Sequence, residues 1–330
     1  MTRPLNVLII GCGEIAGRTD LARGGGTPPM THAGAFAADD RFALAGCVDT
    51  DMALASGFAK AWRFPRSFND LNAALTKPPN GGWEVISICT PDATHGEILE
   101  QVLASAPRIV FCEKPLDTDI DRARRIVRAY RAAGVALAVN HLRRWDPAVA
   151  SFRDELADGA WGAVHTVFGL YTKGLWHNGS HMIDLVTNLF GPVIPERALG
   201  LRDDGAPGDP TIDVRLRLHD GTPVTLMGSD QRSYPVFELT TVCANGAFSM
   251  EQGGFAWRVR HAGASPEFPG HRHLSGGERR TGQIDGAMRA AVANLAAHLD
   301  DGAPLACDGD CALATLECCA KIAELAWAAR

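Results

Sequence analysis

The stretch LNVLIIGCGEIA, residues 5–16, decides the fold. Its first six residues are almost entirely apolar, which predicts a strand buried on both faces. Gly11, Gly13 and Ala16 then fit G-x-G-x-x-A between that strand and a helical segment, the context in which this pattern indicates dinucleotide binding. Glycines there let the backbone turn tightly and approach a pyrophosphate, whose charge the N–H groups at the helix N-terminus bind. The alternative is a tight turn with no ligand.

The rest of the first half repeats this alternation of strand and helix. Further apolar runs predict strands at 42–49, 85–90, 108–113 and 135–140, and helical patterns cover 95–106 and 119–134. The second helix is expected to begin with a Thr118-x-x-Asp121 capping pattern and to end at Gly134. Such alternation is typical of a Rossmann doubly wound parallel sheet.

From about residue 161 the pattern changes. Alternating polar and apolar residues predict strands at 163–172, 211–218 and 224–229, and two helices are expected at 286–302 and 311–329. The predicted fold class is therefore α/β, with an N-terminal Rossmann domain and a C-terminal α+β domain that contains an open, mostly antiparallel sheet. We place the domains at residues 1–144 and 145–330.

Composition restricts the function. The 330 residues carry a formal net charge of −6 and no long basic run, which argues against a nucleic-acid partner. The first apolar run is too short to cross a membrane and lacks a cleavage pattern, so we expect a cytoplasmic protein without a membrane partner. Five of the nine cysteines lie in strand-like runs without C-x-x-C spacing and are predicted to be buried thiols.

The cofactor is expected along the carboxyl ends of the parallel strands. Asp49 ends the second strand, where a carboxylate accepts hydrogen bonds from the adenosine ribose hydroxyls and repels a 2′-phosphate, so NAD is favoured over NADP. The alternative is a polar strand end without that role. The predicted cofactor contacts are Gly11, Cys12, Gly13, Glu14, Ile15, Asp49, Thr90, Pro91, His95, Glu113 and Lys114.

The segment 23–34 separates the glycine pattern from Asp49. It is too rich in glycine and proline to be predicted as helix. It is either a mobile connection or a loop that folds over the site, with Thr31 or His32 facing the cofactor.

Glu113-Lys114-Pro115 places an ammonium group directly after a predicted strand. Oxidation of an alcohol needs its oxygen held and its proton removed, and a lysine can donate to that oxygen. His181 is the candidate base, oriented by Asp184 one helical turn later; alternatively, Ser180 and His181 only cap a helix. His177 and His181 have i,i+4 metal spacing, but no third ligand is evident, so no metal is predicted.

The motifs GCGEIA, CVD, CTPDATH, CEKPL, HLRRWDP and HNGSHMID occur in an order that resembles the Gfo/Idh/MocA oxidoreductase family, with the strongest matches between residues 5 and 191. The resemblance implies NAD(P)-linked oxidation or reduction of sugars, nucleotide sugars or cyclitols. It implies that Lys114 is the family's EKP lysine and that His181 is its proton-transfer histidine. Many relatives have Asp four residues before that histidine, where this chain has His177, the third predicted catalytic residue. The resemblance also implies a homodimer or homotetramer that uses the C-terminal sheet.

Four residues are predicted to contact a carbohydrate-like substrate. Arg143 and Arg144 resemble the basic pair of inositol dehydrogenase-like members. Arg143 either binds a substrate carboxylate or phosphate, or pairs with an acid near the domain junction. Trp176 either covers a sugar ring or is a buried aromatic, and Asn178 lies in the same segment.

These residues predict an NAD-dependent oxidoreductase of a sugar, nucleotide sugar or cyclitol. Two alternatives stay open. One is a catalytically silent NAD(P)-binding regulator, against which Lys114 and His181 argue. The other is a reductase of a non-sugar such as an imine, a dihydrodiol or a tetrapyrrole, because a fold does not determine its substrate.

Overall fold

The computed structural model describes residues 3–24, 27–204 and 207–328. The chain divides into two compact units, one of Met1–Trp145 with Asp285–Ala314 and one of Asp146–Ile284 with Thr315–Arg330. The first boundary between the units lies after Trp145, one residue later than the boundary expected after residue 144. The segment Asp285–Ala314, expected in the second domain, belongs to the first unit. There the Trp145 indole donates to Asn294 Oδ1 at 2.9 Å.

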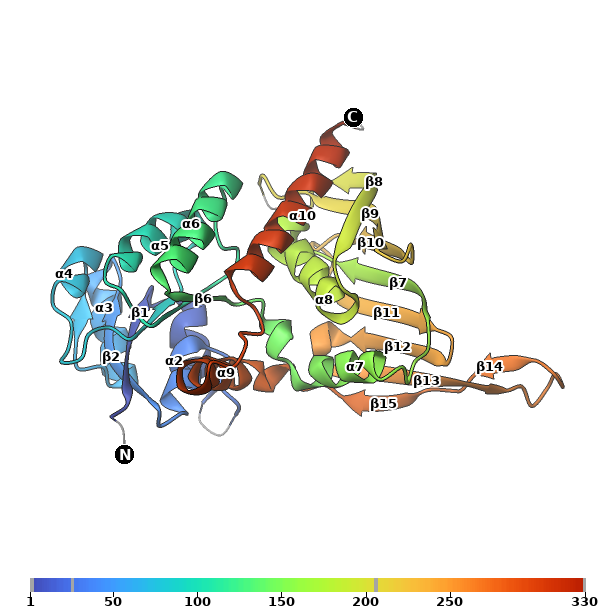
Figure 1. The fold of residues 1–330 in the computed structure, drawn as a ribbon, viewed down its shortest axis with the longest axis horizontal. Coiled ribbons are helices and arrows are strands. Elements are labelled where there is room, and N and C mark those ends of the chain that lie inside the picture. The colour runs from blue at the N-terminus through green and yellow to red at the C-terminus, as the bar shows by residue number, and fades with distance from the viewer. Residues whose placement is uncertain (1–2, 25–26, 205–206, 329–330) are drawn as a thin grey trace. The chain divides into compact units, whose positions relative to one another are not determined.

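The first unit is built on a six-stranded parallel sheet in the order β3-β2-β1-β4-β5-β6 (Figure 1). Its strands are nearly continuous apolar runs and are almost wholly buried, as a sheet covered on both faces requires. The order reverses between β1 and β4, which creates the switch point at which such sheets bind ligands. The strands are β1 (Leu5–Ile10), β2 (Phe42–Val48), β3 (Ser67–Phe68), β4 (Val85–Ile88), β5 (Ile109–Cys112) and β6 (Ala136–Val139).

Helices connect these strands. After the glycine pattern the chain forms a π-helical turn, η1 (Glu14–Arg18), and then the short helix α1 (Thr19–Arg23). The remaining helices of this unit are α2 (His32–Ala37), α3 (Met52–Trp62), α4 (Leu71–Leu75), η2 (Asp92–Thr94), α5 (His95–Leu103), α6 (Ile120–Ala133), η3 (Leu142–Trp145), η6 (Ile284–Gly286, whose first residue falls in the second unit) and α9 (Ala287–Asp301).

Two helix starts differ from the prediction. The segment 23–34 was expected to contain no helix, yet α2 begins at His32 because the Thr31 hydroxyl accepts a hydrogen bond from the Gly34 N–H at 3.4 Å. The N-cap of α6 is Asp119 rather than Thr118, since the Asp119 carboxylate accepts from the N–H groups of Asp121 and Arg122. The predicted end of α6 at Gly134 is confirmed, with Gly134 in the left-handed region at φ 67°.

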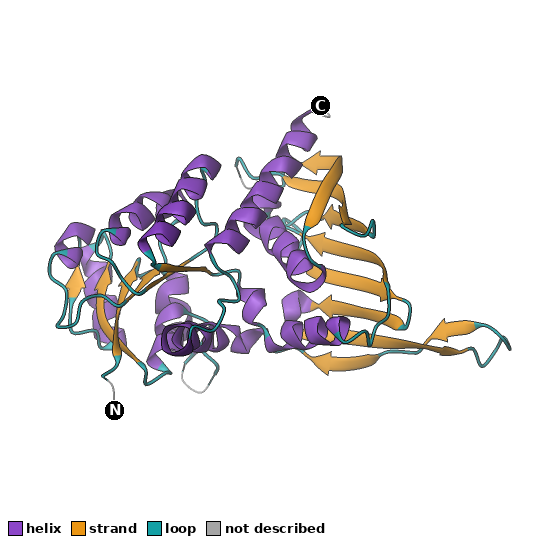
Figure 2. Cartoon of the chain, viewed as in Figure 1, coloured by secondary structure: helices purple, strands orange, loops and turns teal. Residues whose placement is uncertain are grey.

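The second unit contains a nine-stranded sheet, whose strands are drawn in orange in Figure 2. Its strand order is β14-β13-β12-β11-β7-β10-β9-β8, with β15 paired to β13 (Figure 1). All pairs are antiparallel except β7 with β10, so the predicted fold class is confirmed. The strands are β7 (Val164–Tyr171), β8 (Val193–Arg202), β9 (Thr211–Leu218), β10 (Pro223–Gly228), β11 (Phe237–Cys243), β12 (Gly246–Glu251), β13 (Ala256–Ala264), β14 (Arg272–Leu274) and β15 (Glu278–Thr281).

One face of this sheet packs against helices. Alternate strand residues form a core with side chains of α7 (Pro147–Ala157), α8 (Ser180–Phe190) and the second part of α10 (Gly309–Ala328). On β7, Val167 and Tyr171 are fully buried on that face, whereas Phe168 between them points to the other face and is 40% exposed. Two short segments, η4 (Gly174–Gly179) and η5 (Gln252–Gly254), complete the unit. Within the described residues, no helix is long and apolar enough to cross a membrane.

Candidate active site

Gly11 is required by the packing of the strand ends. Its backbone lies in the left-handed region at φ +89°, and its N–H donates to the Val48 carbonyl at 2.8 Å. A Cβ at this position would lie 2.7 Å from the backbone oxygen of Cys89. Only glycine therefore lets β1, β2 and β4 meet at this point.

Gly13 has a different reason to be glycine. Its φ of −82° is open to any residue, and within the described part of the chain no atom lies within 4 Å of a Cβ placed there. Neither the backbone conformation nor the packing requires glycine at position 13. A glycine there would instead allow a ligand to approach the backbone closely, because no side chain stands in its way. Glu14 and Ile15 follow, both exposed, with Ile15 at 39% although it is apolar. The space over Gly13 fits the pyrophosphate of a dinucleotide.

Asp49 lies beside this turn. One carboxylate oxygen accepts from the Cys12 N–H at 2.9 Å, and the other accepts from the Asp51 N–H at 3.0 Å. These two bonds fix the carboxylate at the carboxyl end of β2. Each carboxylate oxygen has a further acceptor site, so Asp49 retains the capacity to accept from ribose hydroxyls.

Thr90 and Pro91 lie in the turn after β4, and His95 is the first residue of α5. His95 is 1% exposed, and its two ring nitrogens lie 2.9 Å from the Thr90 carbonyl oxygen and 2.6 Å from that of Pro115. Its polar atoms thus tie the turn after β4 to the turn after β5. Thr90 is half-buried and Pro91 is exposed. Of the three predicted cofactor contacts, His95 is therefore the one that is buried, with both ring nitrogens in contact with backbone carbonyls.

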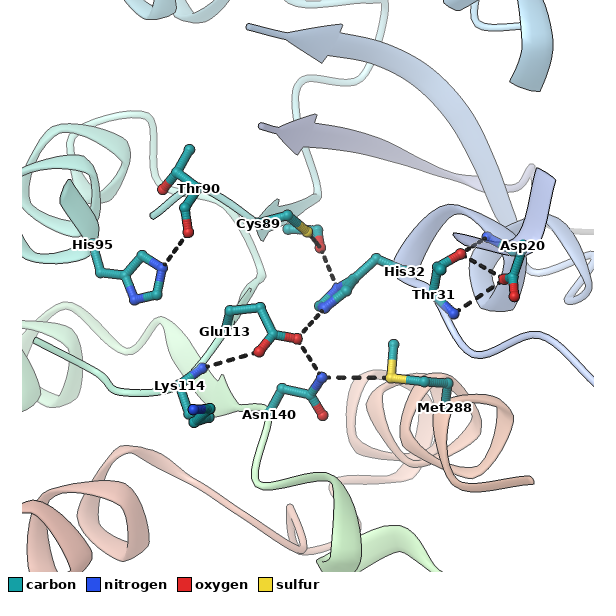
Figure 3. A network of polar contacts seen from close by, with 12 residues as sticks. Asp20, Thr31, His32, Cys89, Thr90, His95, Glu113, Lys114, Asn140 and Met288 are labelled. Atoms are coloured by element: carbon teal, nitrogen blue, oxygen red, sulfur yellow. Dashed lines mark hydrogen bonds and ion pairs between the residues drawn. The ribbon is translucent and has the colours of Figure 1, made fainter. Parts of the chain in front are cut away.

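The Glu113 carboxylate belongs to a buried polar network (Figure 3). Its Oε1 lies 2.9 Å from His32 Nε2 and accepts from the Asn140 amide at 2.6 Å, while its Oε2 accepts from the Lys114 N–H at 3.3 Å. The Ser87 hydroxyl lies 2.7 Å from His32 Nδ1. Of the two residues expected to face the site, His32 contacts Glu113, and Thr31 instead donates to the Asp20 carboxylate at 2.6 Å.

The network holds opposite charges. Burial by itself lowers the pKa of His32, but the opposing effects of the neighbouring Cys89 and of the Glu113 carboxylate outweigh it and raise the pKa to about 10. Burial raises the pKa of Glu113, and the interactions with His32, Asn140 and Lys114 outweigh this and lower it. At neutral pH the pair is therefore an imidazolium and a carboxylate, with the half-buried Lys114 as the next residue.

In the second unit, Asp209 holds the segment that carries the candidate histidines. Its carboxylate accepts from the N–H groups of Trp176 at 2.7 Å and His177 at 2.9 Å. Gly174, at φ +76°, makes room for it, because a Cβ there would lie 2.2 Å from the Asp209 Cγ. Asp209 was missed by sequence reasoning, since no local pattern links it to a segment more than 30 residues earlier.

The predicted residues of this segment differ in exposure. His177 is exposed, Asn178 and His181 are half-buried, and Trp176 is half-buried against the core of the second unit. The Ser180 hydroxyl donates backwards to the Trp176 carbonyl at 2.8 Å, so it does not cap α8. Asp184 is 1% exposed and accepts from the Thr315 hydroxyl at 3.3 Å.

Arg143 and Arg144 lie in η3, directly after β6, and both are half-buried. Arg144 donates to the Ala306 carbonyl at 3.2 Å, which connects η3 to the segment that completes the first unit. Across residues 3–24, 27–204 and 207–328, no group of three or more His, Cys, Asp or Glu side chains is arranged to hold a metal ion.

The parallel sheet, the switch point and the glycine turn with its adjacent Asp49 are the features of a dinucleotide-binding domain. In agreement, residues 5–141 match the family described as "Oxidoreductase family, NAD-binding Rossmann fold". This match over residues 5–141 agrees with the resemblance to Gfo/Idh/MocA oxidoreductases that the motifs indicate. NAD as the cofactor type agrees with that description.

Named relatives are similar over part of their length. An inositol 2-dehydrogenase of Rhizobium meliloti (strain 1021) is 30% identical over 44% of this chain and 42% of the relative. A trans-1,2-dihydrobenzene-1,2-diol dehydrogenase of Bos taurus is 28% identical over 61% of this chain and 63% of the relative. The match thus spans less than two thirds of each relative.

A solved structure extends the likeness in fold to the whole chain. It is an oxidoreductase from Agrobacterium radiobacter in complex with NAD+, L-tartaric acid and magnesium. It is 18% identical, with a TM-score of 0.78 over 100% of this chain and 98% of that chain.

Proposed function

We propose that this chain is an NAD-dependent dehydrogenase that transfers a hydride between nicotinamide and a hydroxyl- or keto-bearing carbon of a sugar, nucleotide sugar or cyclitol. The observation that carries the proposal is the position of Lys114. It follows β5 at the carboxyl edge of a sheet in which the glycine turn follows β1, two strands away. Ligands of such sheets bind along this edge, beside the switch point. The relative that acts on inositol supports the substrate class.

NAD, when bound, supplies the hydride acceptor. In the proposed reaction the Lys114 ammonium donates a hydrogen bond to the substrate hydroxyl and stabilises the negative charge that develops on its oxygen. His181 accepts the hydroxyl proton while the C–H bond breaks as a hydride, and a carbonyl forms. In the reverse direction His181 returns the proton. Asp209 acts indirectly, because its bonds to the backbone at 176 and 177 position the segment that precedes His181.

The proposal is tested by incubating the protein with NAD and a panel of cyclitols, free sugars and nucleotide sugars while NADH absorbance is followed. Turnover of one polyol class, with binding of NADH in a titration, is the expected result. Binding of NADH without turnover of any panel member would favour the silent regulator instead.

Replacing Asp49 by alanine should change cofactor preference. The variant loses a carboxylate that is proposed to accept from the ribose hydroxyls, and each hydrogen bond to a charged group contributes about 1.5–3 kcal/mol. We expect the affinity for NAD relative to NADP to fall by about 10- to 100-fold. Isothermal titration with both cofactors measures this ratio.

Asp51 provides the matched control for that experiment. It caps α3 by accepting from the Ala53 and Leu54 N–H groups at 2.8 and 3.2 Å. Asp51→Ala should cost about 1 kcal/mol of stability without changing the cofactor ratio. Tighter binding of NADP than of NAD by the unaltered protein would contradict the role given to Asp49.

Replacing His181 by asparagine should remove the proton acceptor and preserve much of the side-chain volume. We expect kcat to fall about 100-fold or more. The acid limb of the kcat/KM profile, along which protonation of the accepting histidine stops turnover, should disappear. His165→Asn, at an exposed position on β7, is the control. An unchanged pH profile in His181→Asn would remove this histidine from proton transfer.

A second candidate is a dehydrogenase of a cyclic non-sugar diol. The similarity to the bovine dihydrobenzenediol dehydrogenase favours it. The same chemistry at Lys114 and His181 would serve, since the reacting group is again a secondary alcohol on a ring. Including cyclic diols without further hydroxyls in the substrate panel separates the two.

We further propose that the chain forms a homodimer or homotetramer through the C-terminal sheet. The face of that sheet opposite the helices presents Phe168 at 40% exposure. Light scattering on Phe168→Glu against the unaltered protein tests this, with a smaller assembly expected for the variant.

A further inference from the structure

His32 lies at the start of α2, yet it connects the parallel strands of the first unit. Its imidazole is fully buried against the Phe111 ring of β5, with ring centroids 4.7 Å apart. Ser87 in β4 contacts one ring nitrogen, and Glu113 after β5 contacts the other. Asn140, after β6, contacts the same Glu113 oxygen as His32 does. Three neighbouring strands thus each place one polar group in a single cluster. Figure 3 shows His32, Glu113 and Asn140 of this cluster.

This cluster compensates a buried negative charge. The Glu113 side chain is only 13% exposed, and a buried carboxylate is costly unless it is paired with a cation and hydrogen-bonded. His32 supplies the cation at 2.9 Å, and Asn140 and the Lys114 N–H supply further donors. The titratable groups that act on the pair are Cys89 after β4, Cys112 at the end of β5, and Lys114.

The charge of Glu113 has a second positive neighbour. The Lys114 ammonium interacts electrostatically with this carboxylate. A carboxylate without a further partner would attract the ammonium strongly, because charges interact more strongly where water is excluded. With His32 protonated, Glu113 has a cationic partner of its own at 2.9 Å, so the compensation of its charge does not depend on Lys114.

We propose that His32 is a positioning residue for the Lys114 ammonium: as a buried cation it binds and neutralises Glu113, so that the lysine charge acts on the reacting oxygen of the substrate. This inference deepens the proposed function and rests on it for the role of Lys114. The electrostatic coupling from His32 through Glu113 to Lys114 is a property of the folded chain, and it can be measured without a substrate.

The test is competitive labelling of the lysines with acetic anhydride across a pH series, read by mass spectrometry. The chain has five lysines, and Lys60, exposed on α3, serves as the internal reference. In His32→Gln the unneutralised Glu113 should stabilise the ammonium and raise the apparent pKa of Lys114 by about one unit. Below that pKa, Lys114 labelling relative to Lys60 should fall up to about tenfold.

Two further variants distinguish an electrostatic effect of His32 on Lys114 from a general loss of stability. Glu113→Gln removes the anion and should shift the Lys114 titration in the opposite direction, downward. Ser87→Ala removes a hydrogen bond to His32 but keeps the His32–Glu113 pair, and it should leave the Lys114 titration unchanged. A loss of stability alone would not produce shifts of opposite sign in the first two variants.

The outcomes separate this inference from the proposed function. Unchanged Lys114 titration in both His32→Gln and Glu113→Gln, or equal shifts in the same direction, would overturn the role of His32. If Lys114 shifts as expected but the unaltered protein turns over no substrate, the coupling stands and the dehydrogenase proposal fails. If the substrate panel identifies a substrate, His32→Gln should lower kcat more than it raises KM, with NADH binding unchanged.

Discussion

Lys114→Ala should lower kcat about 1000-fold while NADH binding remains detectable. Loss of one donor to a developing oxyanion typically costs 10²- to 10³-fold in kcat, and Lys114 is proposed to be the charged donor to that oxygen. The lysine follows β5, whereas the glycine turn and Asp49 follow β1 and β2. Initial rates by NADH absorbance and NADH titration followed by tryptophan fluorescence measure the two effects separately.

The comparison variants for this experiment are Lys60→Ala and Lys114→Arg. Lys60 is exposed on α3, and its removal should leave both rate and binding unaltered. Arginine keeps the charge but changes the donor geometry, so Lys114→Arg should recover little of the lost rate. Full activity of Lys114→Ala would show that the reacting oxygen is held by another group.

Gly11→Ala should lower the stability of the fold, whereas Gly13→Ala should mainly lower the affinity for NAD. At Gly11 the added methyl meets the Cys89 backbone at 2.7 Å in a left-handed conformation. Because backbone cannot move aside as a flexible side chain can, we expect the free energy of unfolding to fall by about 3 kcal/mol or more. Urea unfolding followed by circular dichroism measures this loss.

At Gly13 the methyl enters the space over the turn. Stability should change by less than about 1 kcal/mol, since the backbone conformation suits alanine. NAD affinity should nevertheless fall at least about tenfold, a loss of about 1.4 kcal/mol, because the methyl occupies the space into which a pyrophosphate would fit. Equal NAD affinity in Gly13→Ala and the unaltered protein would place the pyrophosphate elsewhere.

The parallel sheet was predictable because its strands are buried on both faces and therefore appear as continuous apolar runs. The strands expected at 5–10, 42–49 and 85–90 correspond to β1, β2 and β4. The start of α2 at His32 was not predictable, because it depends on Asp20, whose carboxylate accepts from the N–H groups of Met30 and Thr31. These hydrogen bonds hold Met30 and Thr31 just before α2, after a segment rich in glycine and proline, which disfavour helix.

The candidate site was predictable only in part. Lys114 and the glycine turn stand out because each directly follows a strand. Ser87 and Asn140 appeared as small polar interruptions in or after apolar runs, and nothing local connects them to His32 more than 50 residues earlier. Their role emerges only when the sheet order β4-β5-β6 brings them to one place. A polar residue within an otherwise apolar predicted strand is the signal that could have identified them.

The nucleotide-binding unit is discontinuous in the sequence, and this has a consequence for biosynthesis. Its last segment, Asp285–Ala314, includes α9, whose Met288 sulfur contacts the Asn140 amide at 3.5 Å and whose Asn294 binds Trp145. On the ribosome these residues emerge after the entire intervening sheet has been translated. The parallel domain begins first but is completed only after the second sheet has been made, so nascent chains stalled before α9 should expose Trp145 and its surroundings to chaperones and proteases.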